Sequence, residues 1–280
     1  MTALEISGLC KTYPAFYLDH VSFKVEAGTI MGFIGRNGAG KSTTIKSLFN
    51  YVHPDEGAVS FFGLPFSEHE AEIKAKVGYV GSDGGYYIHK RLKKITEVTK
   101  SFYPDWDESI YRSCLSRFKL DENKLLKELS EGMKVKYQLT LALSHHARLL
   151  VLDEPTSGLD PVSRDDLLEL FADLVEKEGV SILFSTHITS DLEKCADEVT
   201  YIQNGKILFS GDLRTLRNNY LLVQGAEDAL TDAVRAKLIG CRVHRGSFNA
   251  MVPSELSASL ADFTLTPASI EDVMVYLERE

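Results

Sequence analysis

Residues 35–43, GRNGAGKST, constrain the fold more than any other stretch of the chain. They match the pattern G-x-x-x-x-G-K-[ST] and lie between an apolar run, TIMGFIG, and a helical pattern. Glycines at these spacings let successive backbone N–H groups curl around a phosphate without side chains in the way. The strand–loop–helix context separates such a match from an incidental glycine-rich turn, which is the minor alternative. We therefore expect a loop that binds a nucleoside triphosphate.

The loop's side chains predict which parts of the nucleotide it contacts. Lys41 can reach the β- and γ-phosphates, and the Ser42 hydroxyl can bind Mg²⁺. The start of the following helix adds a partial positive charge. One face of that helix is apolar: Ile45, Leu48, Phe49 and Val52. The nucleotide-binding residues predicted here are Gly35, Arg36, Asn37, Gly38, Ala39, Gly40, Lys41, Ser42 and Thr43.

Two carboxylates end a second apolar run, RLLVLDEP. A continuous apolar run is typical of a strand buried in a parallel sheet, and ligands gather at the carboxyl edge of such sheets. Asp153 can hold magnesium through water, and Glu154 is placed to act as a general base toward an attacking water. The alternative is that both residues merely cap the next turn.

Residues 129–133, LSEGM, open a long helical pattern. Ser130 is a good N-cap, but capping does not explain the bare backbone at Gly132. An exposed helix N-terminus with both residues is also suited to hold an anion. Taken alone, the stretch is best explained as an ordinary capped helix inside a helical subdomain.

Bulk properties exclude several classes of protein. A net charge of −9 argues against nucleic acid as the main partner. No apolar run approaches the ~18 residues that a membrane span needs, and the N-terminus lacks a signal-peptide pattern. The four scattered cysteines lack CxxC spacing and are interpreted as reduced thiols of a cytosolic protein rather than a disulfide framework or zinc site: Cys10, Cys114, Cys195 and Cys241.

GRNGAGKST, LSEGM, LLVLDEPTSGLD and STH, in this order and spacing, resemble the ATP-binding cassette (ABC) ATPases from about residue 4 to 211. The resemblance implies an α/β fold with a P-loop NTPase core of mixed or parallel sheet and an antiparallel β subdomain. A helical insert is expected at about 86–147 and a small C-terminal α+β extension at 212–280. Within the ATPase domain, 1–211, a hairpin is expected to turn at Asn204-Gly205. A final helix is expected to be capped by Thr266 and to start at Pro267.

The resemblance also assigns roles residue by residue. Ser130 and Gly132 would contact the γ-phosphate of ATP held by another subunit, and Asp160, which also caps its helix, would link the two subunits. His187 would touch the γ-phosphate and position the water. Tyr13 would stack on adenine, with Phe16 a less favoured substitute and a buried core tyrosine the alternative. The His145-His146 pair is expected to be structural.

The chain departs from the family pattern where a glutamine normally contacts magnesium and water. Aligning VGYV places Ser82 there, followed by Asp83, which could approach the metal through water. Neither keeps the donor-plus-acceptor capacity of an amide. In the signature, Glu131 and Met133 replace the usual residues, and we expect Glu131 to point away from the phosphates.

Together these features predict an ATP-binding, Mg²⁺-dependent ATPase subunit of a transporter. It would dimerise around ATP, with a copy of itself or a related chain, and power a separate membrane permease gripped near the insert. Export is expected from resemblance alone, as is a cytoplasmic location at the inner face of the membrane. The cluster from His89 to Lys94 could face the permease or lipid headgroups, although a solvated helix face is favoured. The alternatives are a soluble ABC ATPase without a transporter and a slow-hydrolysing regulator.

Overall fold

The computed structural model describes residues 1–81 and 87–278, so the predicted positions of Ser82 and Asp83 lie outside the described residues. The chain forms two compact units, Met1–Ser210 and Gly211–Glu280. None of the described helices has the length and apolar character needed to cross a bilayer.

A six-stranded sheet in the order β10-β9-β3-β8-β7-β6 organises the first unit. Strands β9, β3, β8, β7 and β6 pair in parallel, so their carboxyl ends share one edge. The strand bounds are β3 Ile30–Ile34, β6 Val77–Val80, β7 Leu149–Leu152, β8 Ser181–Thr186, β9 Glu198–Gln203 and β10 Lys206–Asp212. β3, β7 and β8 are buried at every position, as their continuous apolar sequences predict. The predicted Asn204-Gly205 turn is confirmed, with positive φ at both residues.

An antiparallel sheet in the order β2-β1-β4-β5 forms the predicted β subdomain. Its strands are β1 Thr2–Tyr13, β2 Phe16–Glu26, β4 Glu56–Phe61 and β5 Leu64–Pro65. Apolar side chains of this sheet merge with those of β3, β7 and β8 and of the helix after β3 into one core.

Helices connect the parallel strands and form the insert. Their bounds are α1 Lys41–Leu48, α2 Phe66–Lys76, α3 Leu92–Lys100, α4 Glu108–Arg117, α5 Glu131–Ser144, α6 Pro161–Glu178 and α7 Thr189–Cys195. Helix α1 is shorter than predicted. Asn50 adopts a left-handed φ of 58°, so the helix ends before Val52.

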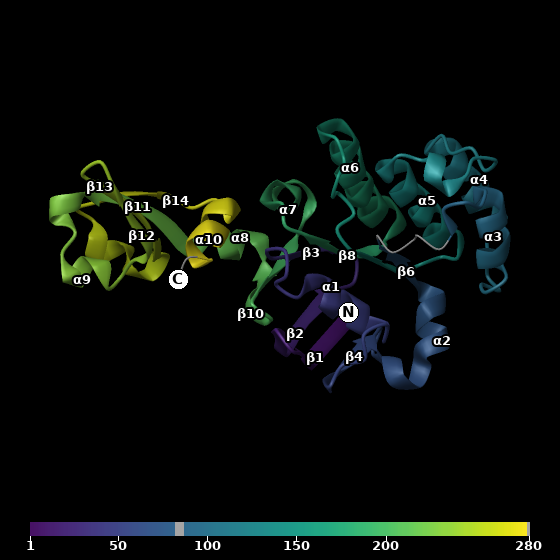
Figure 1. The fold of residues 1–280 in the computed structure, drawn as a ribbon, viewed down its shortest axis with the longest axis horizontal. Coiled ribbons are helices and arrows are strands. Elements are labelled where there is room, and N and C mark those ends of the chain that lie inside the picture. Colours follow the sequence, from purple (N-terminus) through teal and green to yellow (C-terminus); the bar gives the residue numbers. More distant parts are fainter. Residues whose placement is uncertain (82–86, 279–280) are drawn as a thin grey trace. The chain divides into compact units, whose positions relative to one another are not determined.

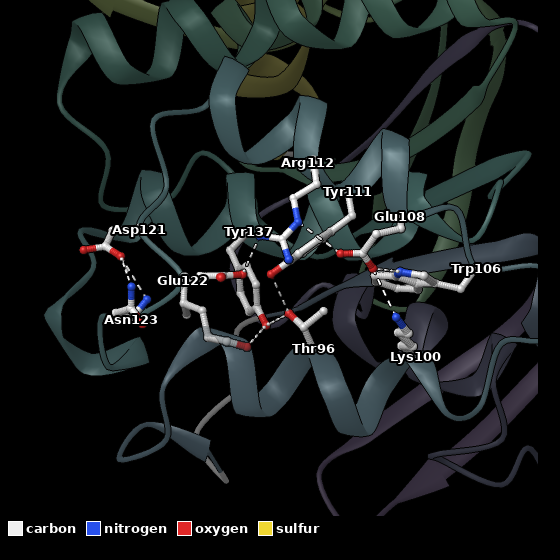
Figure 2. Close-up of polar contacts among 11 residues, drawn as sticks. Thr96, Lys100, Trp106, Glu108, Tyr111, Arg112, Asp121, Glu122, Asn123 and Tyr137 are labelled. Atoms are coloured by element: carbon white, nitrogen blue, oxygen red, sulfur yellow. Dashed lines mark hydrogen bonds and ion pairs between the residues drawn. The ribbon is translucent and has the colours of Figure 1, made fainter.

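The helical insert, α3 to α5, gathers at one end of the first unit (Figure 1) and has its own apolar core. A buried hydroxyl cluster joins the three helices (Figure 2): Thr96 Oγ1 lies 3.0 Å from Tyr111 Oη and 2.9 Å from Tyr137 Oη. Tyr137 also donates to the Leu92 carbonyl at 2.9 Å. Burial raises the pKa of Tyr137, so its phenol stays a neutral donor. These satisfied polar groups fix the position of α5.

The second unit is a four-stranded antiparallel sheet, β12-β13-β11-β14, with short helices. Its elements are α8 Leu213–Asn218, β11 Tyr220–Ala226, α9 Asp232–Arg235, β12 Ile239–His244, β13 Ser247–Pro253, β14 Thr264–Pro267 and α10 Ile270–Leu277. The predicted start of the last helix at Pro267 is wrong. Pro267 ends the edge strand β14, and Ser269 and Asp272 form the capping box of α10 instead.

Candidate functional site

The loop of residues 35–43 follows directly from β3 and opens α1 at the carboxyl edge of the parallel sheet. Gly40 adopts φ 115°, and a Cβ there would lie 2.9 Å from Phe16 Cζ, so only glycine fits. Lys41 is 4% exposed, and its Nζ donates to the carbonyls of Gly35 at 2.8 Å and Arg36 at 3.1 Å. The ammonium is therefore held inside the curve of the loop.

Both predicted carboxylates follow β7 at the same edge. Asp153 is buried, and its Oδ1 accepts hydrogen bonds from Ser42 Oγ at 3.1 Å and Ser185 Oγ at 2.7 Å. Glu154 Oε1 lies 3.0 Å from Lys41 Nζ. The structure thus brings the carboxyl ends of β3, β7 and β8 together, as parallel pairing requires.

Glu154 has a second partner and an unusual backbone. Its Oε2 lies 2.7 Å from Nδ1 of His187, which follows β8. Its backbone adopts φ 52°, a left-handed conformation that costs free energy for a non-glycine residue and is found preferentially at functional sites. The carboxylate thus bridges the loop lysine and the histidine and remains partly exposed, with 22% of the side chain accessible.

Ser185 is a site residue that the sequence analysis missed. It is fully buried, donates to Asp153 and accepts the Glu154 backbone N–H at 2.9 Å. One hydroxyl therefore positions both carboxylates. The signal was available, because Ser185 follows the apolar residues 182–184 in a buried strand, two residues before His187.

The predicted signature helix start is formed as expected. Ser130 caps α5, accepting the Met133 N–H at 3.3 Å. Glu131 pairs with Lys134 at 2.6 Å, and 62% of its side chain is exposed. A Cβ at Gly132 would make only ordinary contacts, 3.6 Å to Leu159 and 3.8 Å to a Ser163 carbon. Among the described residues, the recorded contacts of Ser130 and Gly132 do not include the phosphate loop.

The remaining predicted residues are placed as follows. Asp160 caps α6 by accepting the Val162 and Ser163 N–H groups at 3.1 Å, and hydrogen bonds from Ser163 hold its pKa below the usual value. His145 is structural, as expected: it is buried, stacked on Tyr103 at 3.9 Å, and burial lowers its pKa.

Tyr13 ends β1 and is paired across the hairpin with Phe16. Its ring is 38% exposed, with Lys11 Nζ 5.9 Å from the ring centroid. Exposure argues against the core-tyrosine alternative. Phe16, however, lies closely beside the loop, because a Cβ added at Gly40 would come within 2.9 Å of its ring.

A cleft of about 590 Å³ opens in front of the carboxylates. Asp153 and Glu154 line it from the sheet, and Lys134 and Gln138 line it from α5. The Gln138 side-chain oxygen accepts the Gly81 N–H at 3.1 Å, just after β6. The sequence analysis did not single out Gln138, since nothing in the pattern shows that α5 reaches this strand end.

Comparison with known proteins agrees with this geometry. The family model described as ABC transporter matches residues 18–157. The chain is 30% identical over 211 residues to the ABC transporter ATP-binding protein YtrB of Bacillus subtilis, covering 75% of this chain and 72% of that protein. It is 32% identical over 210 residues to the bacitracin transport ATP-binding protein BcrA of Bacillus licheniformis, covering 74% and 69%.

Among solved structures, the fold is similar to one described as the ATP-binding subunit of an ABC transporter. The TM-score is 0.68 at 30% sequence identity, over 77% of this chain and 92% of that one.

Proposed function

Because the chain belongs to the ABC transporter family, as one of its ATP-binding proteins, we propose that residues 35–43, Asp153, Glu154 and His187 form its ATP hydrolysis site, completed by the signature helix of a second subunit. The chain is an ATP-hydrolysing subunit of a transporter. The observation that carries the site assignment is the Lys41–Glu154–His187 chain of contacts at the carboxyl edge of the sheet.

Lys41 links the binding of phosphate to the release of Glu154, the proposed general base. Its buried ammonium is balanced by Glu154 at 3.0 Å, and ATP phosphates in the loop would compete for the same charge. Binding ATP would therefore release Oε1 of Glu154 to accept a proton from water, while Oε2 stays oriented by His187. Ser185 keeps the peptide of Glu154 in place during this exchange.

The oxygen atoms beside the loop fit a magnesium ion. Ser42 Oγ and the buried Asp153 Oδ1 converge at 3.1 Å, and hard oxygen ligands of this kind suit Mg²⁺. These two residues would hold the ion. When bound, the ion would place positive charge beside the phosphates. Asp83 is proposed as an additional ligand through water on sequence grounds alone.

The signature helix start would serve a nucleotide on another subunit. Within residues 1–81 and 87–278 nothing requires glycine at 132, since a Cβ there would not clash. A close approach by an external group explains the bare backbone, and the Ser130 hydroxyl and helix N-terminus would meet phosphate there. Asp160 would contribute at the same interface, in a homodimer or in a dimer with a related chain.

Transport requires a membrane permease, which we place on the insert. Tyr87 and Val98 are exposed and line a 160 Å³ hollow together with Lys90 and Lys94. An apolar segment flanked by acidic residues, in a loop of the permease, fits this surface. The chain would thereby be held at the inner face of the membrane, and export follows the sequence resemblance. We also propose that 1–211 and 212–280 are separate functional domains.

The ATPase rate of Glu154→Gln against the natural chain tests the catalytic assignment. Removing the base should lower the rate at least about 100-fold and leave Mg-ATP binding intact. Glu70→Gln, which removes a surface ion pair on α2, is the matched control and should keep full activity. Equal background ATPase rates for the natural chain and both variants would leave only the alternative that the protein is a nucleotide-dependent regulator.

Mixing variants tests completion by the partner. Lys41→Ala lacks its loop cation and Gly132→Asp carries a charge at the signature, so each alone should be nearly inactive. A mixed dimer combines the intact loop of one chain with the intact signature of the other, and activity should reappear on mixing. Activity that stays absent in mixtures while dimers form would contradict the shared site.

Co-purification tests the permease. Val98→Asp should abolish recovery of a multi-span membrane protein with the chain and leave the basal ATPase rate unchanged. Glu97→Gln, its neighbour on α3, should retain the partner. Recovery with Val98→Asp equal to that of the natural chain would remove this surface from the proposal.

A further inference from the structure

We infer that Cys10, His20 and Glu56 form a binding site for a zinc-type divalent cation on the antiparallel β subdomain. The ligand atoms of these three side chains all lie within 4.8 Å of one another. The site is separate from the phosphate loop and its carboxylates and does not depend on the proposed function.

Strand pairing brings the three residues together. Cys10 is opposite Glu56 in the β1–β4 pair. On the other side of β1, the register with β2 shifts between Leu9 and Lys11, so that Asp19 and His20 share the space opposite Cys10. Such bulges redirect side chains. The left-handed backbone of His20, φ 48°, belongs to this irregularity.

The surroundings of the histidine match those of a metal ligand. Asp19 Oδ1 lies 2.7 Å from His20 Nδ1, which fixes the ring and leaves the other nitrogen, Nε2, to bind a cation. A carboxylate that orients a histidine in this way is the usual outer partner of zinc-bound imidazole. Lys206 Nζ holds the same carboxylate at 3.0 Å, so Asp19 is itself fixed.

The cysteine is also prepared for this role. Its side chain is 2% exposed, and the sulfur accepts the His20 backbone N–H at 3.4 Å. The thiol also donates weakly to the Gly8 carbonyl at 3.5 Å. Because cysteine binds metal as a thiolate, a bound cation would take the place of that thiol proton.

The three metal-ligand atoms determine which class of cation the site would bind. One sulfur, one imidazole nitrogen and one carboxylate oxygen suit the borderline-soft Zn²⁺, whereas Mg²⁺ prefers oxygen ligands only. Because His20 and Glu56 are exposed, water can supply a fourth ligand. A bound cation would tie β1, β2 and β4 together three residues before Tyr13.

Cobalt titration of the reduced full-length chain tests the site, with excess Mg²⁺ present to saturate all-oxygen sites. The expected result is one Co²⁺ per chain, a thiolate-to-cobalt charge-transfer band, and displacement of the band by Zn²⁺. Cys10→Ala should abolish the band. His20→Asn, which tolerates the left-handed backbone, should weaken Co²⁺ binding at least about tenfold.

Cys241→Ala removes a thiol from the second unit and should leave the titration unchanged. Melting temperatures of all variants, measured without metal, check that they fold. If Cys10→Ala is unstable, His20→Asn still tests the site, because His20 is exposed. A missing band in the natural chain, or a band retained in Cys10→Ala or undiminished in His20→Asn, would overturn the assignment.

Discussion

Two helix starts in this chain, both of which we propose to meet phosphate, differ in what surrounds them. Helix α1 begins at Gly40 without a side-chain cap, and its Lys41 is buried among carbonyls and Glu154. Helix α5 begins with the capping Ser130, and the neighbouring Glu131 is exposed. At the first start, the Lys41 ammonium has its counter-charge, the Glu154 carboxylate, in the same chain. At the second, Ser130 and Glu131 are exposed, which is the property expected of a group offered to another molecule.

The largest effect that separates the two starts is expected for Lys41→Ala. Loss of the buried ammonium should lower the ATPase rate at least about 1,000-fold and weaken ATP binding, because phosphate charge is then unmatched. Rates and equilibrium binding of a fluorescent nucleotide measure both. Lys74→Ala, which removes an ion pair on α2 and the cation–π contacts of Lys74 with Tyr51 and Phe66, should change neither quantity.

Gly132→Asp should affect the second start alone. A carboxylate there repels phosphate and blocks close approach, so the ATPase rate should fall about 100-fold and ATP-dependent dimers should be lost. Binding of ATP to the single chain should remain within about twofold, since α1 is untouched. Ser113→Asp adds the same charge to the exposed face of α4 as a control. Equal loss of single-chain ATP binding would show that the two starts are not independent.

Ser185→Ala tests how the first start is supported by the sheet. Loss of the bonds to Asp153 and Glu154 should lower kcat about tenfold and the free energy of unfolding by about 1–2 kcal/mol. Ser181→Ala is matched to it, because Ser181 lies at the other end of β8 and accepts the Gly28 N–H at 2.9 Å. That control should lose similar stability and keep its activity. If the two variants had equal ATPase activity while their free energies of unfolding differed, the positioning role of Ser185 would be rejected.

The smallest effect concerns the adenine end of the first start. Tyr13→Ala should raise KM for ATP about fivefold, the lower part of the range for losing one stacked base, with kcat little changed. Phe16→Leu is the comparison, since Phe16 contacts Gly40. A larger KM increase for Phe16→Leu than for Tyr13→Ala would move the stacking role to Phe16.

Most residues around the first start can be predicted from the sequence, because each motif specifies the residues and also the buried strand that they follow. Lys41, Asp153, Glu154 and His187 follow buried strands, and parallel pairing leaves only one edge at which those strand ends can meet. The α/β fold and the helical insert were predictable from the family resemblance, and the hairpin was predictable from the turn preference of Asn204-Gly205.

Other features depend on tertiary contacts that leave no periodic signal. The capping box at Ser269 competes with the Thr266-Pro267 signal, and pairing of β14 with β11 decides the outcome. The meeting of Cys10 with Glu56 depends on strand register across 46 residues of chain (56 minus 10). Gln138 reaches Gly81 only because α5 packs beside β6.

The left-handed backbone of Glu154 sets a limit on how this protein can be improved. Glycine or asparagine would relieve that conformation, and ATP phosphates would replace Glu154 as the counter-charge of Lys41, so either replacement should raise the melting temperature of the ATP-bound chain while removing the carboxylate. A library screened only for heat resistance would accumulate such inert variants at this position. Directed evolution of the chain therefore needs selection for turnover alongside selection for robustness.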